Sequence, residues 1–155
     1  MISDTINQKI AEALKAHDGA RLSTLRLLSS ALNYEFIAKQ HKLSEEEELA
    51  VVKREVNKRR DTVETYEKLL KPGKEETKIQ TQIDKEKNEI EILKEYLPPE
   101  LSEEDLSQLV DVAIGETGAT EAKDIGKVIG VVMSKAGASA DGKKVAEMVK
   151  KRLGS

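Results

Sequence analysis

Residues 44–99 read SEEEELAVVKREVNKRRDTVETYEKLLKPGKEETKIQTQIDKEKNEIEILKEYLPP, and this stretch decides the fold. Apolar residues recur at alternating steps of three and four on both sides of Pro72, which is the spacing of one face of an α-helix. Ser44 and Glu47 have the spacing of a capping box and predict where the first helix begins. The proline pair that starts at Pro98 predicts where the second helix ends, because proline cannot continue a helix. The stretch therefore predicts a long antiparallel helical hairpin.

Each helix of this hairpin has one charged residue where its face should be apolar: Arg59 in the first helix and Glu86 in the second. In an antiparallel hairpin the numbers of facing residues add to a constant, which here is 145 or 146, as for Val56 and Ile90. Arg59 and Glu86 also add to 145, so we expect them to meet as a buried or half-buried ion pair. Such a pair adds little net stability but fixes the register, because a slipped hairpin would leave one charge alone. A catalytic or binding role for the two residues is the alternative.

Two further helices are predicted before the hairpin. The first has apolar residues three and four apart and is expected to end at Gly19, a residue that takes the left-handed conformation easily. The second spans residues 22–36 and carries leucines on one face. Leu27 and Tyr34 widen that face, so we expect this helix to be the most buried one. Together with the hairpin these helices predict a four-helix domain over residues 1–97.

Beyond the prolines the pattern changes to three short helices with glycines at the joints. Ser102, Asp124 and Asp141 precede the apolar stretches and are predicted to cap these helices. We therefore expect a small three-helix tail domain over residues 98–155. The predicted fold is all-α, a four-helix N-terminal domain with one long hairpin followed by this tail.

Composition argues against several classes of protein. Aromatic residues make up only 3% of the chain, whereas RRM and OB folds stack RNA bases on exposed aromatic rings. The chain has no cysteine, which excludes disulfide scaffolds and thiol nucleophiles. No apolar run approaches the roughly 20 residues that span a bilayer, and the first residues lack the pattern of a signal peptide. We therefore expect a cytoplasmic protein with no membrane partner.

No catalytic or metal site is predicted. Gly73 and Lys74 resemble part of a phosphate-binding loop but lack its upstream glycine and its serine or threonine. His17 and His41 have no second histidine or carboxylate at the spacing of metal ligands. Without cysteine, and with no histidine next to a serine motif, nucleophilic catalysis has no visible apparatus. We expect no catalytic residue, no metal and no cofactor.

The charge of the chain changes sign abruptly in the tail. Residues 98–122 contain seven acidic side chains and no basic one, whereas residues 123–155 contain eight basic and three acidic ones. A local excess of positive charge indicates an anionic partner, although an ordinary helical surface beside an acidic linker is the alternative. If the partner is RNA, we expect the acidic stretch from Glu100 to Glu121 to face away from it.

Gly126 and Gly130 are four residues apart and share one face of a predicted helix. Glycine costs about 1 kcal/mol in a helix interior, so the pair indicates a close approach to the backbone. A neighbouring helix of the same fold could make that approach, or a ribose–phosphate backbone drawn by nearby lysines and the helix N-terminus. On the second hypothesis the RNA-binding residues are Lys123, Gly126, Lys127, Gly130, Lys143, Lys144, Lys150, Lys151 and Arg152.

The whole chain resembles the YqeY family, whose members are similar to the C-terminal region of one component of the aspartyl/glutamyl-tRNA amidotransferase, the GatB component. The order and spacing of several short segments carry the resemblance. These segments are Leu25-Arg26-Leu27-Leu28, Asn33-Tyr34-Glu35, Arg54-Glu55, Lys58-Arg59-Arg60-Asp61, Glu95-Tyr96-Leu97-Pro98, Asp124 to Gly130 and Ala140-Asp141-Gly142.

The resemblance implies a helical domain joined to a helical tail, and in the amidotransferase the equivalent tail helps to hold the tRNA. It does not supply the kinase-like catalytic domain of that component or the glutaminase partner. We therefore expect a tRNA-binding accessory protein that is non-catalytic by itself. Two alternatives stay open: a protein-interaction or assembly module that docks through its hairpin, and a component of a carbon–nitrogen ligase with glutamine as amido-N-donor.

Overall fold

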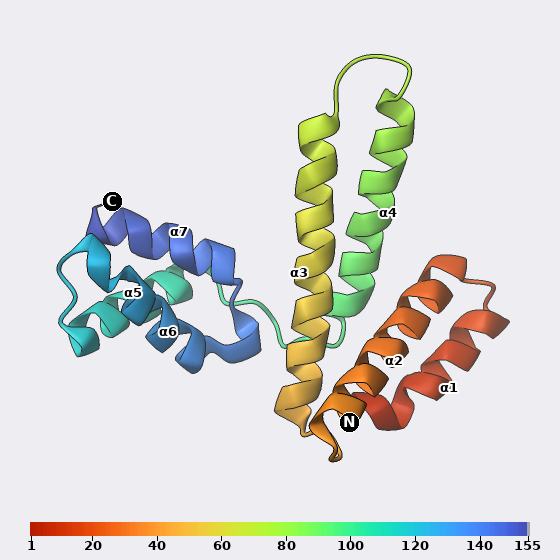
Figure 1. Cartoon of the computed structure of the whole chain (residues 1–155), viewed down its shortest axis with the longest axis horizontal. Coiled ribbons are helices and arrows are strands. Elements are labelled where there is room, and N and C mark those ends of the chain that lie inside the picture. The colour runs from red at the N-terminus through yellow and green to blue at the C-terminus, as the bar shows by residue number, and fades with distance from the viewer. Residues whose placement is uncertain (155) are drawn as a thin grey trace. The chain divides into compact units, whose positions relative to one another are not determined.

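The computed structural model describes residues 1–154, and every regular element in that range is a helix (Figure 1). The prediction of an all-α fold is confirmed. The elements are α1 (Ile2–Lys15), α2 (Gly19–Lys39), α3 (Glu45–Leu69), α4 (Glu76–Lys94), α5 (Glu103–Thr117), η1 (Ala122–Asp124), α6 (Ile125–Ala136), η2 (Gly137–Ser139) and α7 (Gly142–Leu153), where η marks a 3-10 helix. Within the described range, none of the helices combines the length and the apolar character that crossing a bilayer requires.

The chain divides into two compact units, Met1–Leu97 and Pro98–Ser155, which we call the N-terminal unit and the tail unit. The N-terminal unit contains α1 to α4, and its largest core cluster is aliphatic. The tail unit contains α5 to α7 and has a separate aliphatic core. Each unit therefore buries apolar surface of its own.

The hairpin of the N-terminal unit consists of α3 and α4, which run antiparallel (Figure 1). The predicted capping box is present, since Ser44 Oγ accepts a hydrogen bond from the N–H of Glu47 and the Glu47 carboxylate accepts one from the N–H of Ser44. The apolar seam is buried as predicted, with Val56 and Ile90 among the core residues. At the turn Gly73 has a φ of 152°, a conformation that favours glycine.

Arg59 lies inside the hairpin, but its partner is not the predicted one. Its guanidinium donates to Glu89 across the hairpin at 2.9 Å and to Glu55 on its own helix at 3.0 Å. The expected direct pair with Glu86 is therefore wrong. Side chains lean toward the N-terminus of their own helix, so Arg59 and Glu89 lean toward each other in an antiparallel pair. Glu86 leans away, toward the hairpin tip.

Glu86 lies at the edge of this buried charge cluster. The pKa of its carboxyl is raised because burial disfavours the charged form and Glu89 repels it, while Arg59 offsets part of both effects. Arg59 is therefore close enough to act on Glu86 electrostatically, yet its hydrogen bonds are used by the other two carboxylates.

A second buried charge joins α3 to α1. Glu48 is fully buried, and its carboxylate accepts hydrogen bonds from the N–H groups of Ile2 at 2.7 Å and Ser3 at 3.1 Å. These N–H groups belong to the first turn of α1, where backbone donors lack partners within the helix and negative charge is favoured. A residue of α3 thus caps α1. Within the N-terminal unit, the sequence predicts a cap for α3 alone.

The prediction that α2 is the most buried helix is only half right. Its buried leucines are Leu25, Leu28 and Leu32. Leu27 and Tyr34, which the apolar pattern places on a widened buried face, are 52% and 77% exposed. The other three helices of the N-terminal unit cover one side of α2, so its second apolar side faces solvent.

Within the tail unit, two of the predicted caps are present. Ser102 Oγ accepts a hydrogen bond from the N–H of Asp105 at 3.1 Å, and the Asp141 carboxylate accepts one from the N–H of Lys143 at the same distance. Gly118 ends α5 in the left-handed conformation. These local signals position three short helices around a core to which all three contribute.

Candidate nucleic-acid interface

The candidate RNA-binding face begins at the turn before α6. The sequence predicts that Asp124 caps this helix, but its carboxylate accepts hydrogen bonds from the preceding N–H groups of Thr120 and Glu121, each at 3.2 Å. These two bonds are the main reason why the pKa of Asp124 is lowered. The N–H of Ile125 donates to the carbonyl of Ala122. The 3-10 turn η1 therefore occupies part of the N-terminus of α6, and that end offers fewer free donors than the sequence suggested.

Gly126 and Gly130 lie on the exposed side of α6. A Cβ atom added to either glycine would meet no neighbouring heavy atom within 4 Å. Close packing of another helix of the tail unit is therefore not the reason for either glycine. Lys127 and Ser134 are exposed on the same side of the helix. We call the four residues Gly126, Lys127, Gly130 and Ser134 the α6 face. Two of them have no side chain, so a partner can come close to the helix backbone there.

Four of the predicted basic residues are held within the tail unit. Lys123 pairs with Glu121 at 3.0 Å, and Lys144 pairs with Glu100 at 3.7 Å. Arg152 pairs with Asp111 and also donates to Ser107. The backbone N–H of Lys143 belongs to the cap at Asp141. The structure thus does not present the predicted basic residues as one open cluster.

All of the predicted lysines are exposed, and three of them differ from the rest: Lys127, Lys150 and Lys151. No ion pair with another residue in the described part of the chain holds their side chains. Lys127 belongs to the α6 face, and the other two lie in the last turn of α7, where positive charge suits the helix dipole. These three lysines are therefore the first candidates among the predicted contacts.

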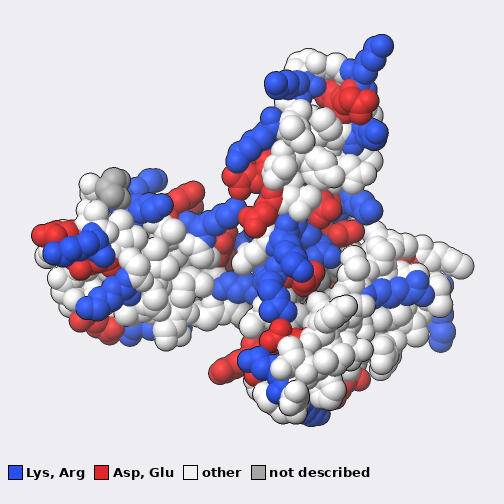
Figure 2. Space-filling model, in the orientation of Figure 1, with Lys and Arg blue, Asp and Glu red and all other residues white. Residues whose placement is uncertain are grey.

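The acidic stretch does not face away from the predicted RNA-binding residues, whereas its orientation relative to an RNA stays a prediction. Its members Glu100, Asp111, Glu116 and Glu121 each pair with a basic side chain of residues 123–155. On the visible side of the tail unit, red and blue side chains are interspersed (Figure 2). The opposite charges of the two segments therefore cancel locally, which the net charge of each segment could not reveal.

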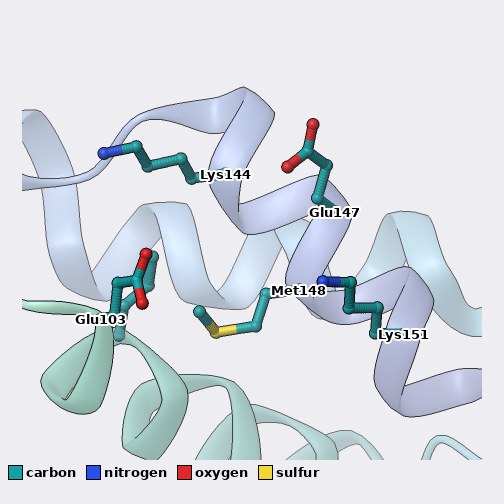
Figure 3. Close-up of a pocket in the computed structure, with 6 residues that line it drawn as sticks. Glu103, Lys144, Glu147, Met148 and Lys151 are labelled. Carbon is teal, nitrogen blue, oxygen red and sulfur yellow. The ribbon is translucent and has the colours of Figure 1, made fainter.

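A hollow lies between α5 and α7 in the tail unit. Glu103 rises toward α7 from the start of α5, Met148 lies between the two helices, and Lys144 and Lys151 flank the opening (Figure 3). Its volume is about 280 Å³, below the roughly 300–1,000 Å³ of typical small-molecule sites. Charges of both signs surround it without converging on one point. We therefore do not assign a ligand to this hollow.

The described residues contain no group of three or more histidine, cysteine or acidic side chains that could hold a metal ion. His17 takes the left-handed conformation at the end of α1, the role expected for Gly19, which instead begins α2. His41 Nδ1 donates a hydrogen bond to the carbonyl oxygen of Lys42, 2.9 Å away. The positions of both histidines are therefore explained by the local structure that follows α1 and α2.

Sequence reasoning missed one candidate surface, the exposed apolar side of α2. Tyr34 and Ile37 are 77% and 67% exposed, more than any other large apolar residues in the described part of the chain. The signal is visible in the sequence, because α2 has apolar residues on both sides, but the same pattern also suits deep burial. Exposure can only be assigned once the neighbouring helices are placed.

Comparison with known proteins gives one result. The family model described as Yqey-like protein matches residues 3–153, which is nearly the whole chain. A comparison with curated proteins found no match.

Proposed function

Because the chain belongs to the YqeY family, we propose that it is an RNA-binding accessory protein that performs no chemistry by itself. The proposed partner is structured RNA, with tRNA as the first choice from the resemblance to the amidotransferase tail. The proposed contact surface is the α6 face together with the exposed lysines of the tail unit. The observation that carries the proposal is the open space above Gly126 and Gly130.

The α6 face suits a ribose–phosphate backbone for two physical reasons. Without side chains at two positions one helical turn apart, the partner can reach the helix surface directly. Lys127 adds a positive charge on the same face, and most hydrogen bonds between proteins and nucleic acids go to phosphate and sugar. Lys150 and Lys151 supply two further charges in the tail unit. The local cancellation of the other charges limits the expected binding strength.

The test is an anisotropy titration of fluorescently labelled tRNA with the full chain. Reversing two exposed lysines, Lys127→Glu and Lys151→Glu, should weaken binding at least tenfold. The matched control reverses Lys71 and Lys74 at the hairpin turn, which changes the net charge equally and should leave binding nearly unchanged. The logarithm of affinity should fall with the logarithm of salt concentration, with a slope of about 0.7–0.9 per neutralised phosphate.

The glycines allow a second arm that separates binding from folding. Gly130→Gln places a long side chain on the α6 face, where nothing in the fold obstructs it. The variant should be more stable than the parent, by up to about 1 kcal/mol, because glycine is a poor helix former. It should nevertheless bind tRNA more weakly. Unchanged tRNA binding by both the lysine and the glycine variants would contradict the proposal.

The second candidate function is a protein-interaction module. The exposed apolar side of α2 favours it, because large exposed apolar groups often mark contact surfaces. Of the two functions, RNA binding is our proposal, since it also draws on the family resemblance. If the unmodified chain shows no tRNA binding in the titration, the interaction module is the better account.

A further inference from the structure

The exposed side of α2 has the residue spacing of a helix-pairing seam. Leu27, Ser30, Tyr34 and Ile37 follow one another at steps of three, four and three, the spacing by which two helices interlock side chains. All four are exposed, and none belongs to the core clusters of the N-terminal unit. We call these four residues the α2 seam. It is distinct from the leucine face that builds the core.

The sizes of the seam residues match when the seam is paired with itself in the antiparallel direction. Around a two-fold axis near Leu32, facing residues have numbers that add to 64. Leu27 then faces Ile37 of the second copy, and the small Ser30 faces the large Tyr34. Ser30 lines a shallow hollow together with Asn33, Tyr34 and Ile37, so each tyrosine of the pair has a place to lie. A parallel pairing would set tyrosine against tyrosine and serine against serine.

The charges around the seam agree with this arrangement. The seam itself has no charged residue, and Arg26 is the exposed charge beside it on α2. In the antiparallel pair the two Arg26 positions lie roughly 18 Å apart along the helix axis, at 1.5 Å per residue. That distance exceeds the screening length of about 8 Å at physiological salt. Parallel pairing of two copies would bring the two arginines together. A different, acidic protein is also disfavoured, because the surroundings of the seam offer few basic groups for it to contact.

We propose that the α2 seam is a homodimer contact in which two copies of this chain pair antiparallel through α2. A contact confined to one helix of each copy is expected to bury about 1,000 Å² in total, below the roughly 1,200–2,000 Å² of stable specific interfaces. We therefore expect a weak dimer that forms only at high protein concentration. This inference does not depend on RNA binding, because the seam lies in the N-terminal unit and the proposed RNA contacts lie in the tail unit.

Sedimentation velocity of the full chain between about 1 and 300 µM tests the proposal, since a weak dimer appears as a concentration-dependent shift. Tyr34→Ser and Ser30→Tyr should each weaken dimerisation at least tenfold, the first by removing the large side chain and the second by a clash. The combined exchange, Ser30→Tyr with Tyr34→Ser, restores one large and one small residue at each facing position. It should recover most of the parent affinity.

Leu69→Ser is the matched control, because Leu69 is an exposed leucine of α3, 58% exposed, that lies outside the seam. It should leave the dimer unchanged. Circular dichroism of each variant should match the parent, since all substituted residues are exposed. A chain that stays monomeric at 300 µM, or a dimer indifferent to Tyr34→Ser, overturns the proposal. Failure of the combined exchange to restore affinity overturns the antiparallel register.

Discussion

The N-terminal unit and the tail unit fix the register of their packed helices with different kinds of residue. The N-terminal unit buries four charged side chains, Glu48, Glu55, Arg59 and Glu89. The described part of the tail unit buries no charged side chain, and its core is entirely aliphatic. This difference in buried charge follows the difference in helix length between the two units.

Long helices with a regular three-and-four pattern can slide past each other by one turn and still bury apolar residues. In α3 and α4 a slipped register would strand the charge of Arg59, so the buried pair with Glu89 penalises the alternatives. The short helices of the tail unit are bounded by caps and glycines, such as Ser102 and Gly118. Their register is already restricted by where each helix begins and ends.

The strongest test of this contrast removes the central charge of the hairpin. Arg59→Met should destabilise the N-terminal unit by about 3–5 kcal/mol, because it leaves Glu89 buried without a partner and Glu55 with Lys58 alone. Hydrogen exchange on the full chain should show faster exchange in α3 and α4 and unchanged exchange in α6. Adding Glu55→Leu and Glu89→Leu should recover much of the loss. Equal acceleration in both units would show that they do not unfold separately.

The matching change in the tail unit creates a cavity instead of an unpaired charge. Leu106 is 3% exposed, so Leu106→Ala should destabilise the tail unit by about 2–5 kcal/mol. The same hydrogen-exchange experiment should now show faster exchange in α5, α6 and α7, with α3 as the internal control. A loss confined to α5 would contradict the view that one core holds the three tail helices together.

A smaller effect is expected at the cap between helices. Glu48→Ala should cost the N-terminal unit about 2–3 kcal/mol, because the N–H groups of Ile2 and Ser3 lose a charged acceptor. Glu48→Gln should cost less, since an amide oxygen can still accept one of these bonds. Exchange of the Ser3 amide measures the cap directly. If both variants were neutral, Glu48 would not act as the cap of α1.

The smallest effect concerns Glu86 and depends on pH. Its pKa is raised in the folded chain by burial and by Glu89. As the pH rises above about 4, the Glu86 carboxyl loses its proton in the unfolded chain before it does so in the folded chain. The free energy of unfolding therefore falls. Glu86→Gln removes that loss and should stabilise the chain at pH 7 by a few tenths of a kcal/mol, with no difference below pH 4. Urea unfolding at both pH values measures it, and destabilisation at pH 7 would indicate a working Arg59–Glu86 pair.

The sequence by itself determined the features that depend on neighbouring residues. The capping box at Ser44, the apolar seam of the hairpin and the cap at Asp141 could be predicted because each rests on contacts within a few residues or on a simple period. The absence of cysteine and the shortage of aromatic residues likewise restricted the chemistry and the class of RNA contact.

Only the tertiary structure decided which groups meet across space. Arg59 pairs with Glu89 because side chains lean along their helices, a direction that matching residue numbers does not include. The outer side of α2 is open because no other helix of its unit covers it, although its apolar pattern also suited burial. The spacing of Gly126 and Gly130 allowed either close packing against a neighbouring helix or exposure to solvent. The placement of α6 leaves both glycines exposed. In each case the spacing along the chain allowed two answers, and packing selected one.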